Sequence, residues 1–212
     1  MAAKTAVYLE VGTKRVFASA AEWPGWCRAG KDEKLALEVL AAYVPRYALV
    51  AKIARIDFPS TAGDDFDIVE RIRGDATTDY GAPGGIAKEE SRSLPAQEVD
   101  RICALVEACW TALDRVVAKA PGHLRKGPRG GGRDRDKMFE HVLDAESAYA
   151  SRIGAKLKPP DFNNHRDVQA FRKAFMEALR SVGEESRWPA RFAARRTAWH
   201  ALDHMWEIED RS

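Results

Sequence analysis

The sequence is poor in the features that define several protein classes. Its three cysteines, Cys27, Cys103 and Cys109, are an odd number in a chain of 212 residues, so they do not indicate a disulfide framework, and a reducing compartment is the default expectation. No apolar run approaches the roughly 18–20 residues that a membrane-spanning helix needs, and the first ten residues lack the apolar stretch of a signal peptide. These absences predict a cytoplasmic protein without a membrane partner.

An excess of charge of one sign is also lacking. The 34 basic and 32 acidic residues leave a formal net charge of +2, which gives no whole-protein electrostatic argument for binding nucleic acid or an anionic membrane. Hydrophobic residues make up 45% and charged residues 31% of the chain, as in ordinary globular proteins. The chain is therefore long enough and apolar enough to bury a substantial core.

The first 75 residues mix the patterns of strands and helices. Apolar and polar residues alternate in several short runs, which is the period of a β-strand. Asp32 suits the N-cap of a helix, and apolar residues follow at helical spacing as far as Ile53, with Pro45 predicting a kink or two successive helices. The predicted strands cover residues 7–11, 14–20, 27–30 and 66–72.

The rest of the chain is predicted to be mainly helical. Glycine and proline are frequent between residues 74 and 92, where apolar residues are few, and this indicates a connection between two units. Beyond it, four stretches carry apolar residues at the spacing of amphipathic helices that pack in a bundle. We therefore predict an α+β fold, with a small sheet-and-helix unit over residues 1–75, a linker over 76–92 and an up-down four-helix bundle over 93–212.

Two of the five histidines stand one helical turn apart. His200 and His204 are spaced i, i+4 on the last predicted helix, so their imidazoles project from nearly the same face. His141, in a mainly apolar part of the second helix of the bundle, is the candidate for a third ligand. Three protein ligands and an open fourth position are typical of a catalytic zinc-type site. The alternative is that these histidines are capping or core residues that bind no metal.

Two segments of the predicted bundle carry a family resemblance. They are Phe139-Glu-His141-Val-Leu-Asp-Ala-Glu-Ser-Ala-Tyr149 and Arg195-Arg-Thr-Ala-Trp-His200-Ala-Leu-Asp-His204. In order and spacing they resemble the DinB-like superfamily of metal-binding four-helix bundles, over about residues 93–212. The resemblance implies a divalent metal held by His141, His200 and His204, with zinc or nickel favoured over iron.

The DinB-like resemblance also implies an activity. Relatives include transferases that use a low-molecular-weight thiol, and a metal ion with an open position favours the thiolate, which is the nucleophile. We therefore expect a divalent-metal-dependent thiol S-transferase or a related enzyme, with a small-molecule thiol and an electrophile as partners. Asp144, Asp203 and Glu207 are candidates to orient the histidines through hydrogen bonds. For each of them, a solvated or ion-paired helix face is the alternative.

A basic, glycine-rich loop precedes the second helix of the bundle. Arg129 and Arg133 flank three glycines, and the N-terminus of the helix that follows favours negative charge. We predict that these arginines bind a carboxylate or phosphate of a cofactor, and the alternative is a loop without a ligand. Nucleic acid is not an expected partner, because no aromatic residues are interleaved with the basic ones.

The first half carries a second resemblance. A hairpin, the turn Trp23-Pro-Gly-Trp-Cys27-Arg-Ala-Gly30 and a helix from Glu33 are similar to HicB-like antitoxin folds over about residues 5–72. Similarity of fold does not establish toxin neutralisation, and the alternatives are that this unit packs on the bundle, covers the mouth of its site or forms a dimer contact. The competing hypothesis for the whole chain is a non-enzymatic stress-response or protein-interaction module with the bundle as scaffold. A homodimer is a further expectation.

Overall fold

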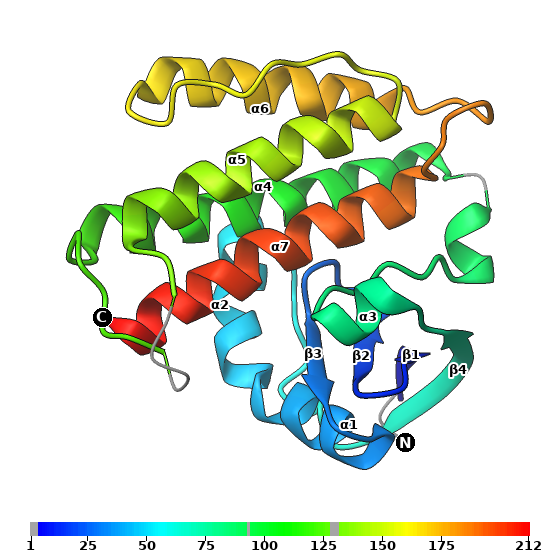
Figure 1. Ribbon diagram of the computed structural model, residues 1–212. Helices are drawn as coiled ribbons and strands as arrows, with labels where there is room; N and C mark the ends of the chain where they lie inside the picture. The colour runs from blue at the N-terminus through cyan, green and yellow to red at the C-terminus, as the bar shows by residue number, and fades with distance from the viewer. Residues whose placement is uncertain (1–3, 93, 128–131) are drawn as a thin grey trace.

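The computed structural model describes residues 4–92, 94–127 and 132–212, and it shows a mixed α+β fold (Figure 1). The fold class predicted from the sequence is confirmed at this level. A four-stranded sheet and two helices come from the first part of the chain, and long helices form the C-terminal part. The assignment of these parts to the HicB-like and DinB-like families stays a prediction.

The sheet contains the four predicted strands in the order β3-β2-β1-β4. β1 is antiparallel to β2 and parallel to β4. The chain therefore crosses over from β3 at one edge of the sheet to β4 at the other edge. The second strand begins two residues later than predicted because Gly12 and Arg15 close the hairpin turn with a backbone hydrogen bond. The strands are β1 (Thr5–Val11), β2 (Val16–Ala20), β3 (Cys27–Gly30) and β4 (Phe66–Arg73).

Two successive helices lie in the crossover, as the position of Pro45 predicted. They are α1 (Glu33–Ala42) and α2 (Val44–Ala54). Asp32 caps α1, because its side chain accepts a hydrogen bond from the backbone N–H of Leu35. Pro45 lies in the first turn of α2, where its missing N–H costs no helical hydrogen bond.

The two faces of the sheet are covered by different parts of the chain. Val7 and Leu9 of β1 are fully buried and join the main core together with Leu40 of α1. Side chains alternate along a strand, and on the other face Phe17 packs edge-on against Trp199, with ring centroids 6.0 Å apart. Trp199 belongs to α7 (Ala190–Arg211). The sheet therefore lies between α1 and α7 (Figure 1).

The segment predicted as a linker packs on the same face of the sheet as α7. Glu10 of β1 is buried and accepts hydrogen bonds from the backbone N–H groups of Gly84 and Gly85. The hydroxyl of Thr78 donates a further hydrogen bond to the Glu10 carboxylate. The segment thus contributes buried contacts between the two halves of the chain. Its elements are α3 (Ala76–Tyr80) and the short 3₁₀ helix η1 (Lys88–Ser91).

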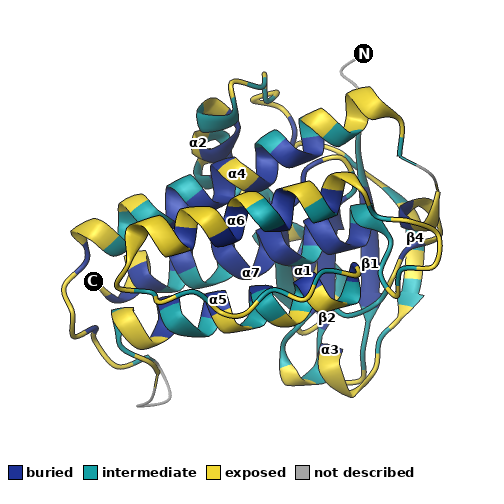
Figure 2. Ribbon diagram, turned by 90° about the horizontal axis from the view of Figure 1, so that it is seen from above, coloured by how far each residue is buried: buried dark blue, intermediate teal, exposed yellow. Residues whose placement is uncertain are grey.

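Four long helices make up the C-terminal part, as predicted. α7 contacts the other three as well as η1, and much of its length is buried, including Phe192 and Trp206 (Figure 2). This central position explains why α7 has apolar residues on several sides, whereas α6 has a single apolar stripe. The other three helices are α4 (Ala96–Lys119), α5 (Arg135–Arg152) and α6 (His165–Arg180).

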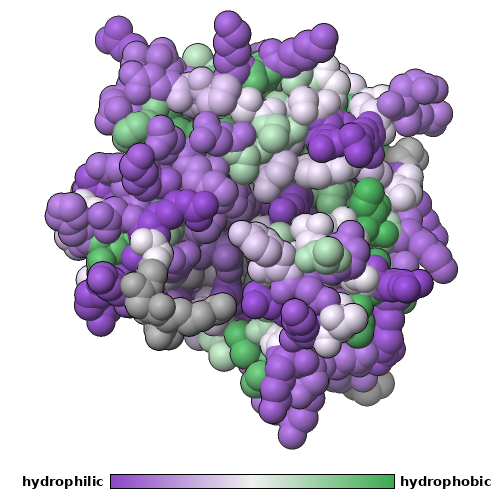
Figure 3. Space-filling model, in the orientation of Figure 1, coloured by the Kyte–Doolittle hydropathy of each residue, from purple (hydrophilic) through white to green (hydrophobic). Residues whose placement is uncertain are grey.

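The surface seen from the side of Figure 1 is mainly hydrophilic, with small hydrophobic patches between polar groups (Figure 3). Among the described residues, no helix combines the length and the apolar character that a membrane crossing requires. Cys27, Cys103 and Cys109 are all buried, and none of them forms a disulfide.

Candidate metal centre

The fold brings three histidines together, two from α7 and one from α5. His200 and His204 lie one turn apart on α7, and their Nε2 atoms are 3.1 Å from each other. The ring of His141 on α5 lies 5.0 Å from that of His200 and 5.2 Å from that of His204, between ring centroids. One ligand atom from each of the three lies within 4.8 Å of the others. The structure therefore places all three predicted metal ligands in one cluster.

The geometry of this histidine cluster fits a divalent cation. Two nitrogen ligands on a tetrahedral zinc, each about 2.0–2.1 Å from the ion, lie roughly 3.3 Å apart. The separation of 3.1 Å between the Nε2 atoms of His200 and His204 is close to that value. Three imidazoles leave at least one position of a tetrahedral ion open for another ligand. The cluster can therefore hold a metal of the zinc or nickel type, because imidazole suits both.

The surroundings keep at least two of the histidines neutral, which a metal ligand requires. Burial lowers the pKa of His200 well below its usual value, and the neighbouring His204 and Arg196 lower it further. Burial also lowers the pKa of His141, and the positive charge of Arg133 adds to this effect. The Nδ1 atom of His200 is buried and has no hydrogen-bond partner among the described residues. With Nε2 as the ligand atom of His200, Nδ1 carries the proton, and a neutral imidazole of this kind can bind a metal ion.

Of the three carboxylates predicted to orient the histidines, Glu207 alone contacts one. Its Oε2 lies 3.4 Å from Nδ1 of His204, and Arg211 donates a hydrogen bond of 2.8 Å to its other oxygen. The contact with His204, followed by that with Arg211, keeps the pKa of Glu207 below its usual value, so Glu207 is ionised and can accept the imidazole N–H. Asp203 instead forms an ion pair with Arg28 at 2.9 Å. Asp144 is exposed, and no described histidine donates a hydrogen bond to it.

Arg196, which forms no ion pair with the described residues, lies beside the cluster. The guanidinium carbon of Arg196 is 4.6 Å from the ring centroid of Trp199 and 5.5 Å from that of Tyr149. Both rings in turn lie against His200, at 5.8 Å and 5.9 Å between centroids. The Nη1 atom of Arg196 is buried with no hydrogen-bond partner in the described part of the chain, and burial lowers the pKa of this side chain. The cluster therefore lies in a positive field.

Sequence reasoning did not assign a role to Arg196 or Tyr149. The signal that could have found them is helical spacing, because Arg196 precedes His200 by one turn and Tyr149 follows His141 by two turns. Arg133, predicted to bind an anion, lies close enough to lower the pKa of both His141 and His200. Arg129, its predicted partner in the loop, lies outside the described residues.

None of the three histidines lines the cavity of about 590 Å³ that lies beside this part of α7, but Glu207, the partner of His204, does. The cavity is bounded by aromatic rings and by charges of both signs, and its volume is usual for a small-molecule site. Its lining includes Arg28, Tyr43, Lys126, Asp203, Trp206 and Arg211.

None of the cysteines of the chain competes for the role of nucleophile. Burial raises the pKa of the Cys27 thiol to about 12 and raises that of Cys103 and Cys109. The reactive form of a thiol is the thiolate, so these three residues are inert at neutral pH.

No protein-family model, curated protein or solved structure matches this chain.

Proposed function

We propose that this protein holds a divalent metal, zinc or nickel, through His141, His200 and His204, and that it activates a low-molecular-weight thiol for transfer to an electrophile. The observation that supports this most directly is the convergence of three imidazoles, with two Nε2 atoms 3.1 Å apart. When bound, the ion supplies a positive charge that favours the thiolate form of a thiol at its open position. The DinB-like resemblance of residues 93–212 points to the same chemistry.

The chain's own residues have separate tasks in this proposal. Glu207 accepts the Nδ1–H of His204, which leaves Nε2 of His204 as the free ligand atom. Arg196 and Arg133 place positive charge beside the cluster, so a thiolate is favoured there over a neutral thiol. In the transfer, the thiol loses its proton to solvent and its sulfur forms a bond to the electrophilic carbon. The bond from that carbon to the leaving group breaks, and the leaving group departs with the electron pair and takes a proton from solvent.

The second candidate is a non-enzymatic interaction module, and one observation favours it. A distance of 3.1 Å between two Nε2 atoms also fits a hydrogen bond between two neutral imidazoles, one of which donates its N–H. In that case the cluster needs no metal, and the bundle is a scaffold. A homodimer and a cytoplasmic location remain predictions under either candidate.

Metal content distinguishes the two candidates. The protein is purified without a histidine tag, as wild type, His204→Ala and His165→Ala, and is then supplied with zinc or nickel. His165 is exposed on α6 outside the cluster, so its variant is a matched control. We expect about one equivalent of metal in the wild type and in His165→Ala, and a large loss in His204→Ala. Wild-type protein that takes up no metal would make the interaction module the better hypothesis.

A further inference from the structure

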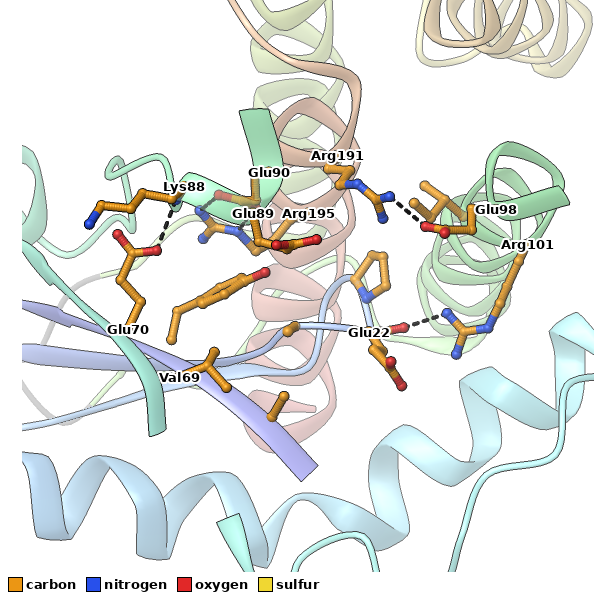
Figure 4. A pocket seen from close by; sticks show the side chains of 15 residues that line it. Glu22, Val69, Glu70, Lys88, Glu89, Glu90, Glu98, Arg101, Arg191 and Arg195 are labelled. Atoms are coloured by element: carbon orange, nitrogen blue, oxygen red, sulfur yellow. Dashed lines mark hydrogen bonds and ion pairs between the residues drawn. The ribbon is translucent and has the colours of Figure 1, made fainter. Parts of the chain in front are cut away.

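A second cavity, of about 740 Å³, lies between the two halves of the chain (Figure 4). It is enclosed by the sheet, the turn after β2, η1 and the N-terminal parts of α4 and α7. Its volume is within the range of about 300–1,000 Å³ that is usual for small-molecule sites, which occur preferentially between domains. None of the three histidines of the metal centre lines it. The cavity is therefore a separate candidate site, which the proposed function does not use.

Tyr8 of β1 presents an unused hydroxyl to this cavity. The residue is only 4% exposed, and its hydroxyl makes no hydrogen bond with any residue that the structure describes. Burial raises its pKa to about 12, so the hydroxyl is neutral and able to donate. The negative charges of Glu90 and Glu89 raise this pKa further, and the positive charges of Arg195 and Arg191 lower it.

Two arginines of α7 add further free donors. Arg195 uses Nε and Nη2 on the buried carboxylate of Glu90, which leaves Nη1 with no partner among the described residues. Arg191, one turn earlier, forms an ion pair through Nη2 with Glu98. Its Nε is buried and has no partner within the same part of the chain. Figure 4 shows the two pairs at the wall of the cavity.

The groups of Tyr8, Arg191 and Arg195 without a partner among the described residues are all donors, so they select an acceptor. Nε of Arg191 is buried, at a cost of about 1–3 kcal/mol that an accepting ligand oxygen removes. Tyr8, Arg191 and Arg195 together provide one hydroxyl and two guanidinium groups around one space. A carboxylate, which accepts several hydrogen bonds and carries a negative charge, matches this set.

The cavity as a whole has no excess of positive charge. Its lining contains five glutamates against three arginines and one lysine, so it does not attract a simple anion. Glu90 and Glu98 are neutralised by the two arginines of α7, whereas Glu22 and Glu70 have no ion pair with the described residues. The Glu70 carboxylate accepts a hydrogen bond of 2.9 Å from the backbone N–H of Lys88, but no described cation neutralises it or Glu22, so both suit an ammonium group. Apolar surface from Pro24, Val69 and Ile102 lies alongside the charged groups.

We propose that this cavity binds a zwitterionic molecule of the short-peptide class. Its carboxylate accepts hydrogen bonds from Tyr8, Arg191 and Arg195, and its ammonium group faces Glu22 and Glu70. The apolar surface between these two regions receives the side chains of the ligand. This inference does not depend on the metal centre, because the two sites share no lining residue.

Calorimetric titration of the full chain with the tripeptide Ala-Leu-Ala tests the inference. The C-terminal amide of the tripeptide and its N-acetyl derivative are titrated in parallel. We expect the free tripeptide to bind and the amide to bind at least about tenfold more weakly, because hydrogen bonds to a charged acceptor contribute about 1.5–3 kcal/mol. The N-acetyl form should lose up to about fivefold, because its partners are exposed. No heat with the free tripeptide at about 10 mM, or equal binding of the amide, would overturn the proposal.

A matched pair of variants tests the assignment of Tyr8. Tyr8→Phe removes only the hydroxyl, and Tyr80→Phe makes the same change at a residue that is 91% exposed and outside the cavity. We expect Tyr8→Phe to weaken tripeptide binding by about three- to tenfold and Tyr80→Phe to have no effect. His204→Ala should also leave tripeptide binding unchanged, which separates this proposal from the metal centre. Equal affinities of Tyr8→Phe and wild type would show that the carboxylate is not bound here.

Discussion

Arg195 of α7 forms a two-point ion pair with Glu90 of η1, and the two side chains are only 5% and 3% exposed. These residues are 105 positions apart in the sequence. A further hydrogen bond of 2.7 Å joins Arg195 to the backbone carbonyl of Gly85. The pair therefore attaches the segment between the two halves to the central helix of the C-terminal part.

Removing one partner of this pair should destabilise the protein strongly. Glu90→Ala leaves the guanidinium of Arg195 buried without its counter-ion, and such losses cost about 3–5 kcal/mol. Glu89→Ala removes an exposed neighbour whose ion pair with Arg92 is also exposed, so its cost should be below about 1 kcal/mol. Urea unfolding of both variants and the wild type measures the difference. Similar midpoints for the two variants would contradict the structural role of Glu90.

The free energy of unfolding should also depend on pH, because one carboxyl group is buried. Glu146 of α5 is fully buried, and Trp110 donates a hydrogen bond of 2.5 Å to its Oε1. Burial raises its pKa to about 7, against the opposing charge of Arg172 and the Trp110 hydrogen bond. The folded state therefore holds this proton at pH values where the unfolded chain, with an ordinary pKa near 4.5, has released it.

The sign of the effect follows from this difference in proton binding. Stability falls as the pH rises from about 4.5 to about 7, and the loss is on the order of 3 kcal/mol at higher pH. Glu146→Gln cannot ionise, so it should match the wild type near pH 4 and exceed it in stability by up to about 3 kcal/mol at pH 8. The exposed Glu177→Gln serves as control. Parallel unfolding curves for the wild type and Glu146→Gln across this pH range would show that Glu146 has an ordinary pKa.

Part of this structure could be predicted from local patterns and part could not. The i, i+4 spacing of His200 and His204 is a property of one helix, so the sequence predicts it. His141 was a candidate because it is a histidine in a mainly apolar helix, and the family resemblance pointed to the same residue. The strands and the break at Pro45 likewise depend on neighbours in the chain. The free donors of Tyr8 and Arg195 depend on how segments from both halves meet around one cavity. The periodicity of residues within one helix or strand does not predict how distant segments pack against each other.

The unpaired charge of Arg196 should give the metal centre a preference for anionic thiols. In cobalt-substituted protein, thiol binding can be followed through the visible absorption of the ion. Mercaptoacetate carries a carboxylate and 2-mercaptoethanol does not. The dissociation constant of 2-mercaptoethanol divided by that of mercaptoacetate therefore measures the preference for the anionic thiol. We expect Arg196→Gln to reduce this ratio by about tenfold, since a charge-assisted hydrogen bond contributes about 1.5–3 kcal/mol. Cobalt binding with an unchanged ratio would refute the role of Arg196 while leaving the metal centre intact.

Glu207 and Asp203 provide a comparison within one helix turn of His204. Glu207 lies 3.4 Å from Nδ1 of His204, whereas Asp203 is engaged by Arg28. Loss of a carboxylate that orients a metal-bound histidine typically costs 10–100-fold in metal affinity. We therefore expect Glu207→Gln to weaken zinc binding by about that factor, measured by competition with a chelator, and Asp203→Asn to leave it nearly unchanged. The reverse order would mean that Asp203 orients the histidine when the metal is bound, because only the carboxylate that accepts the imidazole N–H can hold Nε2 toward the ion.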